Sequence, residues 1–164
     1  MPTNAFPSTI TQVDTAARFP LGYEVTVPAK GAGTTADRGE QVWIYVFNDD
    51  AAWAEGIVVM RDATTVTYDG VLSTAAVPAI RLLGVAQHVI AGGSYGFILK
   101  RGIGEVQADD TGNDQADDPL VTRGAVGRAD VMAAGEEHCV FAFSTENAGA
   151  SAGDKMTCMI NCPG

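Results

Sequence analysis

The amino-acid sequence predicts an all-β fold: a small β-barrel or sandwich with little helix. Short runs of apolar and polar residues recur along the chain, and glycine- or proline-rich turns separate them. Glycine occupies 19 of the 164 positions and proline 7, which shortens regular elements. No long stretch keeps an apolar stripe at helical spacing. We expect one domain over residues 21–164, preceded by an extended arm over residues 1–20.

The N-terminal arm is predicted because Pro2, Pro7 and Pro20 interrupt any strand ladder. Polar residues separate its few apolar side chains, which an isolated tail would leave in water. Such a tail is either a frayed terminus or a strap that packs on another surface. For a strap, the residues expected to contact a neighbouring surface are Phe6, Ile10, Val13 and Phe19.

From Gly22 onward the pattern becomes that of strands. In residues 23–27 every second side chain is apolar, which predicts a half-buried strand. Residues 41–47, QVWIYVF, are apolar on both faces and rich in β-branched and aromatic side chains. They predict a central strand, or a strand whose second face meets a partner. For a partner, the expected self-association residues are Trp43, Tyr45 and Phe47.

Further strand-like runs follow to the end of the chain. They are residues 57–60, 64–68, 79–90, 96–101, 105–108, 121–129, 138–144 and 156–162. Many short strands at close spacing favour a barrel or a sandwich.

Residues 92–96, GGSYG, match the G-x-S-x-G turn that exposes the nucleophilic serine of α/β-hydrolases. The carboxylates of residues 109–118 and then His138 follow in the chain order of a hydrolase triad. However, a hydrolase elbow opens a helix, and residues 97–102 are strand-like. We therefore interpret Ser94 as a turn residue and predict no catalytic residue and no enzyme. A serine hydrolase using Ser94 is the less favoured alternative.

The cysteines raise the question of a metal site. Cys139 shares a predicted strand face with Phe141 and Phe143, and Cys158 and Cys162 share one with Met156 and Ile160. This pattern favours core packing over a zinc site with His138. The aspartate-rich run from Asp109 to Asp118 lacks the spacing of an EF-hand, and a solvated loop is favoured over a cation site. We predict no metal and no cofactor. A metal-stabilised binding module is a further alternative.

The charge balance excludes several partners. The formal net charge is −10, with 20 acidic and 10 basic residues, and the largest basic cluster is the pair Lys100-Arg101. Nucleic acids and anionic membranes are disfavoured, because their affinity depends on Lys and Arg. The N-terminus lacks the basic segment followed by an apolar segment that marks a signal peptide, and no apolar run reaches about 20 residues. We therefore expect neither secretion nor a membrane span. The odd number of cysteines fits synthesis in a reducing cytoplasm.

Residues 79–109 contain one series of spaced glycines, which we call the glycine phrase. It comprises the tripeptide GVA at residues 84–86, then Ile90, and then Gly92, Gly96 and Gly102, before the segment at residues 106–108. A DPL tripeptide follows at residues 118–120. On these motifs, with FPLG at residues 19–22 upstream, the chain resembles small head decoration (cement) proteins of tailed bacteriophages over residues 19–130.

The resemblance implies a non-catalytic β-barrel or β-tulip module on the outer surface of an icosahedral capsid, made in the host cytoplasm. The implied partners are a major capsid protein of the HK97-type fold and further copies of the same chain, with a trimer favoured over a dimer. The arm residues would then contact the capsid or a neighbour. Another virion component, of the tail tube or a head fibre, is the alternative within the same class.

Overall fold

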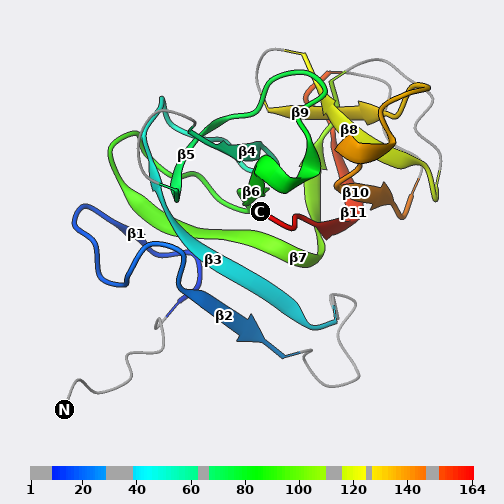
Figure 1. Ribbon diagram of the computed structural model, residues 1–164. Coiled ribbons are helices and arrows are strands. Elements are labelled where there is room, and N and C mark those ends of the chain that lie inside the picture. Colours follow the sequence, from blue (N-terminus) through cyan, green and yellow to red (C-terminus); the bar gives the residue numbers. More distant parts are fainter. Residues whose placement is uncertain (1–8, 29–38, 63–66, 110–115, 125–126, 147–151) are drawn as a thin grey trace.

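Nearly all regular structure is β in the computed structural model, which describes residues 9–28, 39–62, 67–109, 116–124, 127–146 and 152–164 (Figure 1). The strands are β1 (Val13–Asp14), β2 (Glu24–Val27), β3 (Gln41–Asn48), β4 (Val58–Arg61), β5 (Asp69–Leu72), β6 (Leu82–Val85), β7 (Tyr95–Gln107), β8 (Pro119–Arg123), β9 (Arg128–Val131), β10 (Ala142–Ser144) and β11 (Lys155–Asn161). Two 3-10 helices, η1 (Ala79–Arg81) and η2 (Glu137–Cys139), interrupt them. The predicted all-β class with little helix is confirmed.

Five strands close into a barrel. Their order is β3–β5–β4–β6–β7, and β7 pairs with β3 again to complete the ring. The β3–β5 pair is parallel, whereas the other pairs are antiparallel. A smaller apolar cluster fills the barrel, with Leu72 of β5 packed against it. Its buried members are Ile44, Val46, Trp53, Val59, Leu83, Ala86, Ile90 and Ile98.

The C-terminal half of β7 extends beyond the barrel and begins a second group of strands, with β8 to β11 on the right of Figure 1. Strand β11 pairs with it, and the order continues through β10 and β8 to β9. A bridge between Ala108 and Ala129 brings β9 back beside the end of β7. The second group therefore curls around the larger core cluster, which includes Leu120, Phe141 and Ile160.

Strand β7 joins the two halves of the molecule, although the sequence predicted two separate strands, residues 96–101 and 105–108, joined by a turn at the GIG of residues 102–104. Gly102 has a φ of 122°, which glycine adopts at low cost, and the strand continues through it. At Gly104 an added Cβ would overlap the side chain of Leu99 and approach Gln87 Oε1 at 2.9 Å. These glycines allow close packing along one strand rather than a reversal of the chain.

Other predicted runs are subdivided. Residues 79–90 comprise η1, β6 and a bridge at Ile90, and residues 138–144 comprise η2 and β10. Residues 121–129 separate into β8 and β9, with positive φ at Gly124 and Gly127 between them. Strand β5 begins at Asp69, after the predicted run at 64–68, of which residues 64–66 lie outside the described part.

Candidate binding surfaces

A strap over residues 9–21 packs on the barrel of its own chain. Its strand β1 pairs with the start of β7, with Asp14 opposite Tyr95. The Asp14 carboxylate is 8% exposed and accepts hydrogen bonds from the Tyr45 hydroxyl and from Gln12 Nε2, both at 2.9 Å. The backbone N–H of Arg18 donates to the Tyr45 oxygen at 3.2 Å. The Tyr45 hydroxyl of β3 therefore holds the strap at two points, Asp14 and Arg18. We call these two hydrogen bonds the Tyr45 anchor.

Aromatic packing completes the attachment of the strap. The Phe19 ring stacks on Tyr23 with centroids 5.4 Å apart and meets Tyr45 edge-on at 5.3 Å. Ile10 and Phe19 pack against the larger core cluster, whereas Val13 is 36% exposed. Phe6 lies outside the described residues. Of the four predicted arm contacts, the structure thus places Ile10 and Phe19 on the chain's own core and leaves Val13 at the surface.

The three aromatic residues predicted for self-association lie on β3. Trp43 is 5% exposed and Tyr45 is fully buried, both in the larger core cluster of the same chain. Phe47 is half-buried and packs on the Tyr95 ring, with centroids 4.8 Å apart. The two apolar faces of β3 are explained within one chain, because one faces the barrel interior and the other the larger core. Trp43 and Tyr45 present no exposed ring to a second copy.

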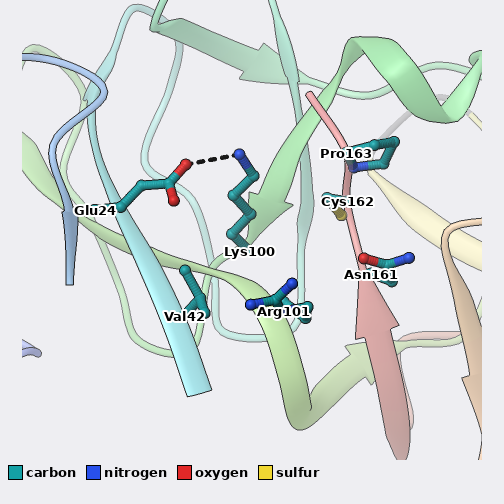
Figure 2. Close-up of a pocket in the computed structure, with 7 residues that line it drawn as sticks. All are labelled: Glu24, Val42, Lys100, Arg101, Asn161, Cys162 and Pro163. Carbon is teal, nitrogen blue, oxygen red and sulfur yellow. Dashed lines mark hydrogen bonds and ion pairs between the residues drawn. The ribbon is translucent and has the colours of Figure 1, made fainter. Parts of the chain in front are cut away.

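A pocket of about 320 Å³ opens where β2, β3 and β7 meet the C-terminal segment (Figure 2). It is lined by Glu24, Val42, Lys100, Arg101, Asn161, Cys162 and Pro163. Val42 pairs with Arg101 and the next residue of β3 pairs with Leu99, so Lys100 is an extra residue on β7. A bulge of this kind re-aims side chains. Lys100 and Arg101, although adjacent on a strand, both line the pocket.

Two cationic side chains line the pocket: Lys100, which is paired with a carboxylate, and Arg101, which has no such partner among the described residues. Lys100 Nζ lies 2.7 Å from Glu24 Oε1. The exposed Arg101 side chain has no hydrogen bond or ion pair with another described residue. Burial raises the pKa of Cys162 to about 12, so this thiol is neutral at ordinary pH. Arg101 beside the Asn161 amide suits a carboxylate, which a guanidinium binds through two parallel hydrogen bonds.

Ser94 lies in a turn, as predicted. Gly93 has a φ of 71° and the backbone N–H of Asn48 donates to the Ser94 carbonyl at 2.8 Å. Strand β7 follows directly, where a hydrolase elbow would begin a helix. Ser94 is 7% exposed, whereas His138 is exposed in η2.

The three cysteines are buried and unoxidised, and each belongs to the core or its edge. Burial also raises the pKa of the Cys139 thiol. Over the described residues no group of three or more His, Cys, Asp or Glu side chains is arranged to hold a metal ion. Of the aspartate-rich run, residues 110–115 lie outside the described part. No helix within the described segments is long and apolar enough to cross a membrane.

The sequence did not predict the Tyr45 anchor or the pocket. Asp14 and Tyr45 are 31 positions apart, and no local pattern links them. For the pocket there was one local signal, since Lys100-Arg101 is the largest basic pair of an acidic chain. The bulge that turns both side chains to the same side arises from the pairing of β3 with β7, which is not readable from either segment alone.

The comparisons with known proteins show a likeness in fold to a solved structure. No protein-family model matches the sequence, and no curated protein matches it. Among solved structures, the chain is similar to the N-terminal base of the head fiber protein gp8.5 of bacteriophage phi29, with a TM-score of 0.55 and 15% sequence identity. The match covers 74% of this chain and 94% of that chain. At this identity the likeness is one of fold.

Proposed function

We propose that this chain is a structural protein of a phage virion that binds the outer surface of the head and stabilises the shell without catalysis. The observation that carries the proposal is the fold shared with the base of a phage head fiber. The glycine phrase of residues 79–109, which resembles that of head decoration proteins, supports it independently.

The physical properties of the chain fit attachment to an outer surface. Its net charge of −10 is suited to the outside of a shell rather than to the DNA side, because like charges repel. The barrel is closed, and β1 and the Tyr45 anchor hold the strap on it. The proposed shell contacts are Phe6 and the exposed Val13 at the N-terminal end. Many weak contacts of this kind, repeated over a lattice, would add up through multivalency.

The choice between a shell-wide cement protein and a head fibre base depends on copy number. The likeness to a head fiber base supports a fibre base as the alternative to a cement protein. A cement protein covers the whole lattice and approaches the copy number of the shell protein, whereas a fibre base occupies fewer sites. Quantitative mass spectrometry of gradient-purified particles against the major shell protein separates the two. Absence of the chain from particles would refute both.

The contribution of the N-terminal end is tested by deleting residues 2–8. This deletion spares the strap from residue 9 onward, so the barrel and its anchor remain. We expect particle binding to fall while the thermal unfolding midpoint stays unchanged. A matched control is Val89→Ser, which alters a residue that is 63% exposed and lies outside the strap. Unchanged binding by the deletion variant would remove residues 2–8 from the contact.

A further inference from the structure

A row of apolar side chains crosses the solvent face of the second strand group. Met159 of β11 lies opposite Ile103 of β7 and opposite Phe143 of β10, and Phe143 lies opposite Pro119 of β8. Directly opposed residues of neighbouring strands share one face, so these four side chains form one apolar stripe. Met159 is 47% exposed and Phe143 is 50% exposed. The centre of the apolar stripe therefore faces water.

The two long sides of the apolar stripe differ in charge. Glu105 of β7 lies on one side. The Glu146 carboxylate lies on the same side and accepts a hydrogen bond from the backbone N–H of Thr157 in β11 at 2.6 Å. Lys155 on this side is shared between Glu55 and Glu105, so carboxylates exceed cations. On the other side lies Arg101, the unpaired cation of the pocket. Glu105 and Arg101 lie four residues apart on β7, which corresponds to about 13 Å at a rise of ~3.3 Å per residue.

We propose that the apolar stripe is the contact between two copies of this chain, related by a two-fold axis that runs along the stripe. Such an axis lays one stripe on the other and places the acidic side of each copy, with Glu105 and Glu146, over Arg101 of the second copy. Arg101 of each copy then faces Glu105 of the second copy. A two-fold axis perpendicular to the stripe, within the plane of contact, would instead place Glu105 opposite Glu105 and Arg101 opposite Arg101, so the charge pattern selects the first arrangement.

The size of the surface sets the strength to be expected. Four strands at ~4.8 Å spacing and five residues along each give a contact plane of about 300 Å². Stable interfaces bury about 800 Å² on each partner. We therefore expect a reversible dimer that dissociates in the micromolar range or above, and that is strengthened where a lattice holds copies side by side. This inference does not depend on the proposed function.

Sedimentation velocity of the full chain over a range of on the order of 1 to 500 µM tests the apolar contact. We expect a shift from monomer to dimer that Met159→Lys weakens by about tenfold or more, because it buries two unpaired ammonium groups. The control is Val89→Lys, which makes the same kind of change at a residue 63% exposed outside the stripe. Thermal unfolding of both variants verifies that the chain remains folded.

Charge reversal tests the direction of the axis. Arg101→Glu and Glu105→Arg are each expected to weaken the dimer by about tenfold, because each opposes like charges at two symmetry-related positions. The double variant exchanges the charges at residues 101 and 105 and is expected to restore dimerisation to within about threefold of the parent. A rescue of this kind requires that residue 101 of one copy meets residue 105 of the other.

Several results would overturn the proposal. A chain that stays monomeric over the whole range, a trimer or larger assembly, or a dimer insensitive to Met159→Lys would each refute it. Failure of the double charge reversal to restore the dimer would refute the two-fold arrangement. A monomeric chain whose binding to particles is lost in Met159→Lys would assign the apolar stripe to the shell instead of a second copy.

Discussion

The Tyr45→Phe substitution is the sharpest test of how the strap is held. It removes the hydroxyl that donates to Asp14 at 2.9 Å and accepts from the Arg18 N–H at 3.2 Å, and it leaves the ring packing intact. Asp14 is 8% exposed and would retain Gln12 Nε2 at 2.9 Å and the Arg18 guanidinium at 3.6 Å. Hydrogen bonds to a charged group contribute about 1.5–3 kcal/mol. We therefore expect a loss of about 2 kcal/mol in the free energy of unfolding.

Urea and thermal unfolding measure this loss. A destabilisation of about 2 kcal/mol corresponds to a fall in Tm of roughly 4–8 °C for a chain of this size. The matched control is Tyr23→Phe, because Tyr23 is 41% exposed and contacts the strap through its ring. That variant should stay within about 0.5 kcal/mol of the parent. A Tyr45→Phe chain as stable as the parent, or a Tyr23→Phe chain equally destabilised, would refute the anchor.

Three further predictions concern pH, thiol reactivity and packing. Burial raises the pKa of Tyr45 from 10.0 to about 12, so the stability that its neutral hydroxyl contributes is complete below pH 10 and is lost as pH rises through 12. The free energy of unfolding measured across alkaline pH should show this loss in the parent and not in Tyr45→Phe. Burial raises the pKa of Cys162 to about 12, so mass spectrometry should find iodoacetamide labelling at pH 8 only after unfolding in urea, and labelling of the native thiol would contradict its burial. Gly104→Ala would overlap the Leu99 side chain and should cost about 1–3 kcal/mol in urea unfolding, whereas an unchanged midpoint would show that Leu99 moves aside freely.

The sequence predicted the class of the fold because each strand records its own environment. Strand β11 is an example, since Met156, Cys158 and Ile160 are all buried and alternate with exposed or half-buried residues. Strand β3 was likewise predicted as a strand that is apolar on both faces. The sequence did not predict what covers the second face: one alternative was another copy of the chain, but the larger core of the same chain covers it.

The candidate sites were less predictable because they depend on long-range pairing. Register places Met159 between Ile103 and Phe143, three residues that are far apart in sequence and unremarkable one by one. Likewise, Phe19 was recognised as an apolar residue of an arm, but its position on Tyr45 required the folded strap. The signal available beforehand was weak. Alternation placed Met159 on the face opposite Cys158, but it placed Phe143 on the same face as the buried Cys139 and Phe141, whereas the Phe143 side chain is 50% exposed.

Closing both strand groups also leaves little backbone free for uncontrolled polymerisation. The barrel ring has no open edge between β3 and β7, and β9 is covered where the backbone N–H of Asp109 donates to Ala129 at 2.8 Å. Within the described residues β2 pairs with a strand on its β3 side alone, and it is four residues long and carries Glu24. Short, charged edge strands resist the addition of further chains. Copies crowded at high local concentration would therefore associate through side chains, in assemblies of fixed size, and not by strand-to-strand growth into fibrils.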